Sequence, residues 1–317
     1  MKYLKYFKTD ADYQNYFKSD DFVTPNVSYV EDTNIVYYNP YDLIMTSESN
    51  PEVMKVCYNQ GWAASPSEMH ASEAAKVTSI GTAFESLGNG DSASGDSGSN
   101  ISFTFSFDEF KYFTGVTSIV KDAFYGSNIV SITIPDSVTS IGGRAFYNCS
   151  SLTSITIPDS VTSIGGDAFS NCDSLPVENN LRYADTYLDG AVDRSLSTYT
   201  IKKGTKWIGE SAFIRCSNLT SITIPDSVTS IGEYAFDNCS SLTSITISDS
   251  VTSIGEYVFN GCSNLNEIIC FATTAPSIWG TTFTGLNSYG TLRIPAGSDY
   301  SSWKNSLGFR WTTEEIQ

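Results

Sequence analysis

A segment of this chain recurs almost unchanged along its length. Residues 152–165 (LTSITIPDSVTSIG) reappear without change at 219–232, and again at 242–255 with Ser248 in place of a proline. Phenylalanines follow the same rhythm at spacings of 22, 23, 44, 23, 23 and 24 residues: Phe124, Phe146, Phe169, Phe213, Phe236, Phe259 and Phe283. The spacing of 44 is one period plus an insertion of 21 residues. A fixed period near 23 residues predicts a solenoid of stacked repeats.

The residues of one repeat divide between a core and a surface. Alternation places Leu152, Ile155 and Ile157 on one side of a short strand and Thr156 on the other. Pro158 then favours a turn, because proline presets φ. Further apolar positions follow at Val161, Ile164, Phe169 and Cys172. A single repeat cannot bury these side chains by itself, so neighbouring repeats must stack.

The pattern L-x-x-I-x-I-P-x-S-V-x-x-I-G-x-x-A-F-x-x-C resembles the repeat of the BspA-like leucine-rich-repeat family, over about residues 114–295. The resemblance implies a leucine-rich-repeat solenoid with short parallel strands on one side and an irregular or 3₁₀ convex side. It also implies a protein that binds surfaces or partners and is not an enzyme.

The remaining segments suggest a domain plan around this solenoid. We expect residues 1–50 to form a small α+β anchoring segment, with a helix after Thr9 and a hairpin of 27–30 with 35–38. Residues 51–113 are expected to be a helical cap with a degenerate first repeat at 77–84 and a flexible loop at 88–100. Residues 114–295 form the solenoid, from which we expect a hairpin at about 177–199 to project, turning at Asp189-Gly190. Residues 296–317 are the predicted C-terminal cap, filled by Tyr300, Trp303, Leu307, Phe309 and Trp311.

Composition excludes several classes of partner. The 317 residues carry 18 basic and 35 acidic side chains, a net charge of −17, and no basic run. We therefore expect no nucleic-acid partner. No apolar stretch is long enough to cross a bilayer, so no membrane insertion is expected. The first ten residues lack the apolar stretch of a secretory signal, which predicts that the chain is not exported by that route on its own.

Two ladders of repeated residues could bind metal, but simpler interpretations are favoured. Five cysteines recur in register, and burial as small apolar side chains is favoured over disulfide staples or a metal ladder: Cys149, Cys172, Cys216, Cys239 and Cys262. One aspartate per repeat follows the strand, and a solvated turn residue is favoured over a calcium ligand because calcium needs six to eight oxygens: Asp136, Asp159, Asp226 and Asp249.

No residue set predicts catalysis. The segment Gly95-Asp96-Ser97-Gly98 is similar to the nucleophile stretch of chymotrypsin-like proteases, but it lies in a Gly/Ser-rich loop that cannot orient a triad. His70 is the only histidine, and we expect it on the surface of a capping helix. We predict no catalytic residue, no cofactor and no bound metal, and therefore a protein that is not an enzyme.

Repeated threonines are the candidate binding face. The strand alternation directs one threonine of each repeat outward, where a row of hydroxyls could meet a glycan or another polar surface: Thr133, Thr156, Thr223 and Thr246. The competing interpretation is that threonine simply suits a solvated strand position. The repeats differ mainly just before each Phe, at 143–144, 166–167, 210–211, 233–234 and 256–257, where differences in recognition would lie.

A second resemblance concerns the N-terminus. Residues 22–40 resemble a leader segment of proteins from gut-bacterial phages and prophages, which implies docking onto a particle. Aromatic residues here are the candidate docking set: Phe22, Tyr29, Tyr37, Tyr38 and Tyr41.

Three functional hypotheses follow. The first is a virion component of a phage, anchored to other virion proteins by residues 1–50, whose repeats attach to a host glycan or protein. The second is a BspA-type adhesin or protein-interaction module at the bacterial surface or outside the cell. The third is a cell-wall or glycan hydrolase, for which no carboxylate pair is specified. Homo-oligomer formation is left open.

Overall fold

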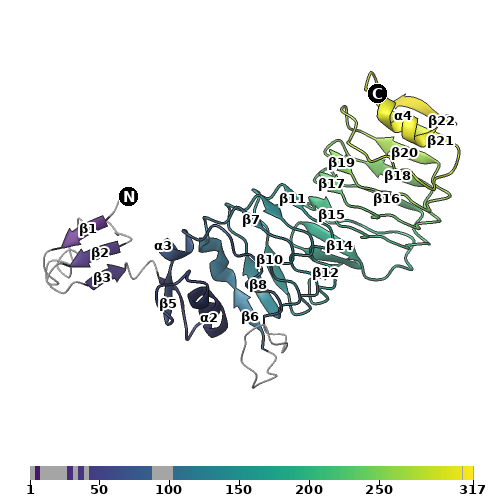
Figure 1. The fold of residues 1–317 in the computed structure, drawn as a ribbon. Coiled ribbons are helices and arrows are strands. Elements are labelled where there is room, and N and C mark those ends of the chain that lie inside the picture. The colour runs from purple at the N-terminus through teal and green to yellow at the C-terminus, as the bar shows by residue number, and fades with distance from the viewer. Residues whose placement is uncertain are drawn as a thin grey trace. The chain divides into compact units, whose positions relative to one another are not determined.

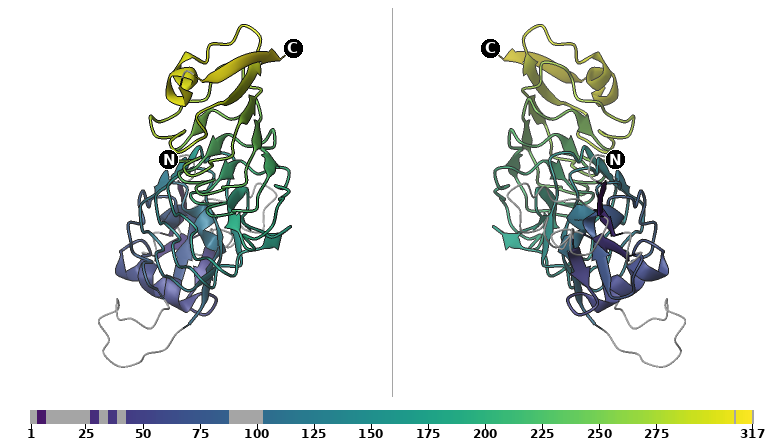
Figure 2. Two further views of the ribbon diagram at one scale, coloured as in Figure 1. Left: turned by 90° about the vertical axis from the view of Figure 1, so that its right-hand side faces the viewer. Right: turned by 90° about the vertical axis from the view of Figure 1, so that its left-hand side faces the viewer.

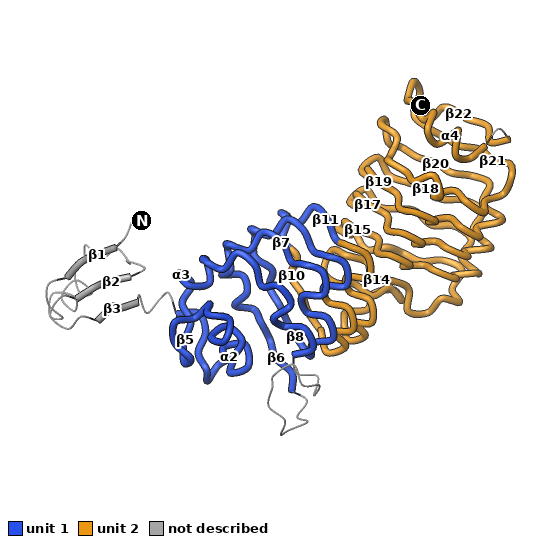
Figure 3. Tube along the Cα trace, viewed as in Figure 1, with its two compact units in different colours: residues 1–145, 158–164 blue, residues 146–157, 165–317 orange. Residues whose placement is uncertain are grey.

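The computed structural model describes residues 4–7, 27–30, 35–38, 43–87, 103–308 and 310–316. These fall into two compact units (Figure 3). Unit 1 comprises residues 1–145 and 158–164, and unit 2 comprises 146–157 and 165–317. Short strands linked by turns dominate both units, and helices are few (Figure 1, Figure 2). This is a leucine-rich-repeat solenoid with parallel strands, as the sequence predicted.

A three-stranded sheet lies at the N-terminus. Strand β1 (Leu4–Phe7) pairs in parallel with β2 (Val27–Val30), and β2 pairs in an antiparallel manner with β3 (Ile35–Tyr38). The predicted hairpin is therefore confirmed. The helix predicted after Thr9 and the loop predicted at 88–100 lie outside the described residues.

The predicted cap before the first repeat contains two helices and a pair of antiparallel strands. Strand β4 (Leu43–Thr46) pairs with β5 (Glu68–His70), and the helices are α2 (Pro51–Asn59) and α3 (Ala71–Ala74). Pro51 is at the helix start, as expected from its fixed φ and missing N–H. Val53, Met54 and Cys57 are fully buried on one face of α2.

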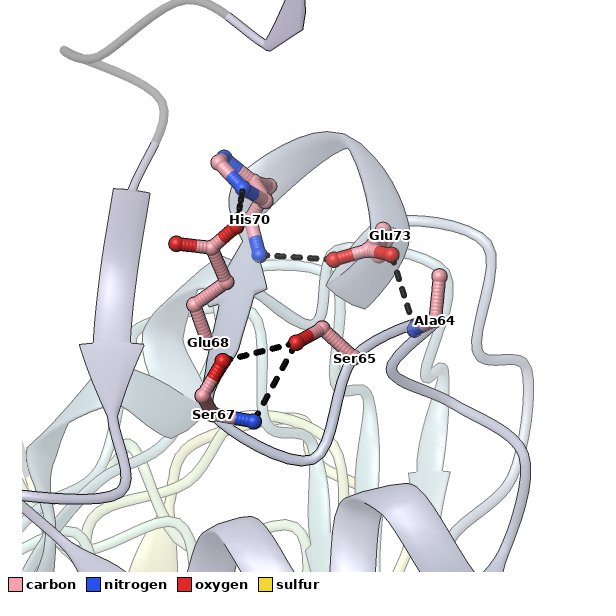
Figure 4. A network of polar contacts seen from close by, with 6 residues as sticks. All are labelled: Ala64, Ser65, Ser67, Glu68, His70 and Glu73. Carbon is pink, nitrogen blue, oxygen red and sulfur yellow. Dashed lines mark hydrogen bonds and ion pairs between the residues drawn. The ribbon is translucent and has the colours of Figure 1, made fainter. Parts of the chain in front are cut away.

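His70 is not on the surface, which corrects the sequence-based expectation. It ends strand β5, and only 5% of it is exposed. Its backbone N–H donates to Glu73 Oε2 at 2.9 Å, and its Nε2 lies 3.7 Å from Glu68 Oε1 (Figure 4). Glu73 Oε1 also accepts from the Ala64 N–H at 3.0 Å, so this buried carboxylate joins α3 to the preceding loop (Figure 4). The expectation failed because His70 belongs to a paired strand before the helix.

Unit 1 contains the first rungs, a rung being one turn of the repeat. Strand β6 pairs in parallel with β8, and β9 pairs in parallel with both β7 and β11. The degenerate repeat contributes Val77, Ile80 and Phe84 to the core, as predicted. The elements are β6 (Phe105–Phe107), the 3₁₀ helix η2 (Asp108–Tyr112), β7 (Ser118–Ile119), β8 (Ile129–Thr133), β9 (Ser140–Ile141) and β11 (Ser163–Ile164).

Unit 2 contains two ladders of strands, one from each extended run of the repeat. The first extended runs from β16 onward form a parallel sheet in the order β16, β18, β20, β21, β22, and β10 is not part of it. The second runs, with the insertion, form a sheet in the order β12, β13, β14, β15, β17, β19. The first-run strands are β10 (Ser154–Thr156), β16 (Ser221–Thr223), β18 (Ser244–Ile247), β20 (Glu267–Cys270), β21 (Gly290–Pro295) and β22 (Trp311–Ile316). The second-run strands are β15 (Trp207–Ile208), β17 (Ser230–Ile231) and β19 (Ser253–Ile254).

The phenylalanine at each period fills the core. Within unit 2, Phe213 stacks on Phe236 with ring centroids 5.1 Å apart, and Phe236 stacks on Phe259 at 5.9 Å. The planes of these neighbouring rings differ by 3° and 7°. The predicted apolar stack is therefore confirmed, and Cys216, Cys239, Cys262 and Cys270 lie in the same core. All seven cysteines of the chain are buried and free.

The turn side of the rungs, which carries the Phe and Cys positions, is more regular than predicted. Ser211, Phe213 and Arg215 donate their backbone N–H groups to the next rung, at Glu233, Ala235 and Asp237. The residues one period later repeat this pattern. A regular turn contains two residues with positive φ four positions apart, for example Ser211 at 57° and Arg215 at 58°. Backbone hydrogen bonds therefore join neighbouring rungs on the turn side as well as along the strands.

The insertion adds strands to the second ladder. Strand β12 (Val177–Glu178) pairs in an antiparallel manner with β13 (Leu181–Ala184), and β13 with β14 (Tyr187–Ala191). The hairpin therefore turns at 185–186, and Asp189-Gly190 lies inside β14. The predicted hairpin within 177–199 is confirmed, but its turn position and its projection were wrong, because β14 pairs in parallel with β15 and buries Tyr187 and Leu188. A Cβ at Gly190 would lie 3.0 Å from the Ala212 carbonyl oxygen, so this glycine permits close backbone packing.

The C-terminal end is closed by an aromatic plug and one further strand. Tyr300 and Trp303, in or beside α4 (Ser301–Leu307), are fully buried, and Trp303 packs on Phe283 with centroids 5.2 Å apart. Leu307 packs on the same core, whereas Phe309 lies outside the described residues. Strand β22, which the sequence reasoning missed, pairs in parallel with β21.

Candidate binding surface

Each regular rung of unit 2 has three threonine positions, and two of them hold neighbouring rungs together. After the leucine, Thr243 Oγ1 donates to the Thr220 carbonyl at 3.1 Å. After the valine, Thr252 Oγ1 donates to the Thr229 carbonyl at 3.1 Å. Unit 1 repeats the second contact, since Thr162 Oγ1 donates to the Thr139 carbonyl at 3.2 Å. These hydroxyls serve the stack, which explains why threonine recurs at both positions.

The third threonine lies on the outward face of the strand, and it is the residue predicted for binding. Thr223 and Thr246 are direct neighbours in the β16–β18 pairing. Thr156 and Thr223 are exposed, and Thr133 and Thr246 are partly exposed. Among the described residues, none of these four hydroxyls takes part in a side-chain hydrogen bond. They are the threonines that stacking does not use.

The structure brings only part of this predicted set together. Thr223 and Thr246 share one sheet, whereas Thr156 lies on β10 and Thr133 on β8, which are not strands of that sheet. We call the outward side chains of the sheet from β16 to β22 the strand face of unit 2. Its hydroxyl-bearing end is formed by Ser221, Thr223, Ser244 and Thr246.

The other end of the strand face carries charges and aromatic residues that the sequence reasoning did not single out. Thr246 on β18 pairs with Ile269 on β20, and Ile269 pairs in turn with Arg293 on β21. Arg293 Nε lies 3.2 Å from Glu267 Oε1 and 3.3 Å from Glu314 Oε2. Beside these strands Phe271 and Tyr289 are 49% and 59% exposed. The alternation of the two final strands could have indicated Arg293 and Glu314, but the repeat consensus ends before them.

The predicted docking residues are only partly described. Tyr29 lies on β2, and Tyr37 and Tyr38 lie on β3. In the pairing of these two strands, Tyr29 is opposite Val36. Phe22 and Tyr41 lie outside the described residues. The docking role of all five aromatic residues stays a prediction.

The two candidate metal ladders have structural roles or face solvent. Asp136, Asp159, Asp226 and Asp249 are all exposed. The thiols donate to the core: Cys239 Sγ lies 3.1 Å from the Phe213 carbonyl oxygen, and Cys262 Sγ lies 3.1 Å from that of Phe236. In the described ranges, no group of three or more His, Cys, Asp or Glu side chains could hold a metal ion.

Acidic side chains gather where the insertion meets the regular rungs. Burial raises the pKa of Asp189 to about 7, opposed by Arg182 and reinforced by Asp173 and Asp167. Burial, together with Asp167 and Glu233, raises the pKa of Glu210 to about 7. A Cβ at Gly166 would lie 2.2 Å from Glu210 Oε2, so glycine leaves room for this carboxylate. These two carboxyl groups therefore change charge near neutral pH.

Comparison with known proteins identifies the family. A family model described as the BspA type leucine rich repeat region matches residues 101–187 and 192–304, with six copies of the repeat. The chain belongs to the BspA-type leucine-rich-repeat family. Proteins of this family are typically non-enzymatic binding or structural proteins. Among the helices that the structure describes, none is long and apolar enough to span a membrane.

Solved structures of leucine-rich-repeat proteins share low sequence identity with this chain. A leucine-rich-repeat protein of T. pallidum, TpLRR, is 26% identical, with 63% of this chain and 81% of that chain covered and a TM-score of 0.28. A leucine-rich cell surface protein of Faecalibacterium prausnitzii is 22% identical, with 66% and 86% covered and a TM-score of 0.32. The pneumococcal vaccine antigen PcpA is 16% identical, with 80% and 87% covered and a TM-score of 0.26. No curated protein matches the chain.

Proposed function

We propose that this chain is a non-enzymatic adhesion module of the bacterial surface that recognises its ligand through the strand face of unit 2. Membership of the BspA-type family supports the class of function and the location. The different hydrogen bonding of the threonines within a rung supports the strand face as the binding surface. Two threonines of each rung donate to the neighbouring rung, whereas Thr223 and Thr246 present hydroxyls that the stack does not use.

The composition of this face indicates what kind of ligand it suits. Hydroxyls at one end can exchange hydrogen bonds with a polar surface. At the other end, Phe271 follows β20 and Tyr289 precedes β21, and both offer exposed aromatic area. Arg293 on β21 forms ion pairs with Glu267 and Glu314 at this end. Aromatic residues and arginine are favoured at recognition surfaces. A glycan or a protein surface fits this combination.

The experiment is a screen of the purified chain on a glycan array and on an array of extracellular proteins, followed by variants. Thr223→Arg with Thr246→Arg places two bulky charges on the strand face and should weaken binding of any hit about tenfold or more. The matched control is Ser211→Arg with Ser263→Arg, which adds the same charge on the turn side. Equal loss in both variants, or no hit on either array, would contradict the proposal.

The virion hypothesis is kept as a separate prediction. It depends on residues 1–50, where the strands β1, β2 and β3 are described. Deleting residues 1–50 should abolish incorporation into particles if these residues are the anchor. Mass spectrometry of purified particles and of bacterial surface fractions separates this hypothesis from the adhesin proposal.

A further inference from the structure

The rung that follows the insertion in unit 2 differs from the regular rungs at one turn. Residues 196–209 (LSTYTIKKGTKWIG) align with the next regular rung at a constant spacing of 23 residues. Backbone hydrogen bonds hold the two rungs in this register, because Thr220 N–H donates to the Ser197 carbonyl and Thr229 N–H donates to the Lys206 carbonyl. The regular rung therefore shows which residues a turn at this position needs for stacking.

Three lysines distinguish the turn of this rung. Lys202 and Lys203 stand where the regular rungs have proline or serine followed by aspartate, and Lys206 stands at a threonine position. The aspartates at the position of Lys203 in the other rungs are Asp136, Asp159, Asp226 and Asp249. Because these rungs stack without lysine, stacking does not explain the change of charge. We call Lys202, Lys203 and Lys206 the lysine turn.

The lysine turn continues the hydroxyl-bearing end of the strand face. Just before it, Tyr199 and Ile201 are buried, whereas Thr198 and Thr200 are exposed. The spacing of 23 residues places these two threonines beside the outward serine and threonine of β16. The row of hydroxyls therefore extends one rung further than the regular repeats, and the lysine turn begins one residue after it.

The charges of the lysine turn are held on aromatic rings and not on carboxylates. Lys202 Nζ lies 4.5 Å from the centroid of the Tyr183 ring, and Lys206 Nζ lies 5.8 Å from that of the Trp207 ring. Lys203 is exposed. Within the described ranges, neither Lys202 nor Lys203 forms an ion pair, although the chain has 35 acidic residues. These two ammonium groups are therefore available to an anionic ligand.

Two hydroxyl groups beside the lysine turn have no hydrogen-bond partner among the described residues. Ser227 Oγ and Thr186 Oγ1 are both buried. Ser227 takes the position of Gly204 one rung later, and the Thr186 carbonyl accepts the Lys206 N–H at 2.8 Å. In an earlier rung the matching serine, Ser160, donates to the preceding rung. A buried hydroxyl without a partner indicates an unfilled hydrogen-bonding position, and here there is one on each side of the lysine turn.

We propose that the lysine turn binds the carboxylate or phosphate group of an acidic glycan whose sugar hydroxyls lie on the hydroxyl-bearing end of the strand face. This inference rests on the proposed function and names the class of its ligand. Ammonium groups bind such oxygens through charge-assisted hydrogen bonds. The net charge of −17 repels an anion at longer distances, so affinity for an acidic glycan has to come from the local lysines.

The test titrates the full chain with two matched pairs of sugars. The first pair is oligogalacturonate and its neutral methyl ester, and the second is mannose 6-phosphate and mannose. The charged member of one pair should bind about tenfold more tightly than its neutral counterpart, and the pair that responds identifies the anionic group. Equal binding of charged and neutral members in both pairs, or no binding of either charged member, would overturn the inference.

Variants of the lysine turn locate the effect. Lys202→Gln with Lys203→Gln should weaken binding of the charged sugar about tenfold and change binding of its neutral counterpart less than about twofold. The two Arg variants should retain binding because the charges remain. The matched control, Lys76→Gln with Lys304→Gln, removes two exposed charges elsewhere and should have less than about a twofold effect. Equal losses in the two Gln variants would overturn the inference.

A further variant guards against a loss of folding. Lys203→Asp gives the turn the aspartate that the other rungs carry, so the rung should fold as they do. It should weaken binding of the charged sugar at least as much as the double Gln variant does. Unchanged binding in Lys203→Asp would contradict a contact between the anion and this turn.

Failure of this inference can be told apart from failure of the proposed function. If Thr223→Val with Thr246→Val loses binding and the lysine variants keep it, the strand face binds its ligand without the lysine turn, and only this inference is wrong. If the lysine variants lose binding and the threonine variant keeps it, the strand face is not the binding surface, and both proposals are wrong. The inference requires that both sets of variants lose affinity for the same charged sugar.

Discussion

The regular rungs of unit 2 and its insertion bury aromatic rings in different ways. From Phe213 to Phe283 the rings lie nearly parallel, within 7° between neighbours. At the insertion, Phe169 meets Tyr187 at 56° and Phe213 meets Tyr199 at 60°. Identical rungs present identical faces to each other, so parallel stacking and repeated hydrogen bonds follow. Where the period breaks, tyrosines replace phenylalanine, and partly buried carboxylates accumulate at Asp189 and Glu210.

The largest expected effect comes from breaking the regular stack. Phe236→Ala removes a fully buried ring between Phe213 and Phe259. We expect a loss of about 3–5 kcal/mol in the free energy of unfolding, because neighbours on both sides lose contacts. Urea unfolding measures it. Phe271→Ala, at an exposed ring, is the control and should change stability by less than about 0.5 kcal/mol; similar effects of the two variants would contradict the stack.

A smaller effect is expected at the glycine that ends each second strand. A Cβ at Gly255 would lie 2.7 Å from the Glu233 backbone nitrogen, whereas nothing lies within 4 Å of one at Gly280. Gly255→Ala should therefore destabilise the chain by about 1–3 kcal/mol through overpacking between rungs. Gly280→Ala should be close to neutral in the same unfolding assay. A neutral Gly255→Ala would mean that the rungs are not in backbone contact there.

The insertion should make stability depend on pH. Folding raises the pKa of Asp189 from 3.8 and of Glu210 from 4.5, each to about 7. The folded chain therefore holds protons that the unfolded chain releases between about pH 4 and pH 7, and stability falls as the pH rises through this window. We expect Asp189→Asn to raise stability at pH 8 by about 1 kcal/mol, a few degrees in Tm, with less gain at pH 5.

Thermal unfolding at pH 5 and pH 8 measures this difference. The control is Asp226→Asn, at an exposed turn in a regular rung, which should leave the pH dependence unchanged. If Asp189→Asn changes the Tm by the same amount at pH 5 and at pH 8, the Asp189 carboxyl group does not titrate between these pH values in the folded chain, which would contradict the account.

Much of the architecture could be predicted because it repeats. The stacked phenylalanines, the buried cysteines and the outward threonines follow from alternation and period alone, without knowledge of long-range contacts. The turn side could not be predicted in the same way. The backbone of the turn side depends on positive φ at residues such as Arg144 and Tyr234, and these residue types do not indicate a positive φ in the sequence. Glycine or asparagine occupies only the second such position of most rungs.

The turn of the insertion and the charged end of the strand face were the parts that sequence reasoning missed. Asp189-Gly190 has the composition of a hairpin turn, but pairing of β14 with β15 drew these residues into a strand. The turn falls instead at Asp185, which has φ 53°. Arg293, Glu267 and Glu314 lie on three different strands, so their ion pairs depend on register beyond the repeat consensus. Alternation identifies Thr223 and Thr246 as outward, but the hydrogen bonds that the other threonines donate to the neighbouring rung depend on contacts between rungs that the sequence does not show.

The central claim is that the threonines of a rung are divided between stacking and recognition. Urea unfolding of two isosteric double variants, with array binding measured on the same samples, tests it most directly. Thr229→Val with Thr252→Val should lose about 1 kcal/mol of stability and keep its ligand, because two inter-rung hydrogen bonds are removed. Thr223→Val with Thr246→Val should keep its stability and lose affinity. The reverse pattern, or equal effects of both variants on both quantities, would contradict the account.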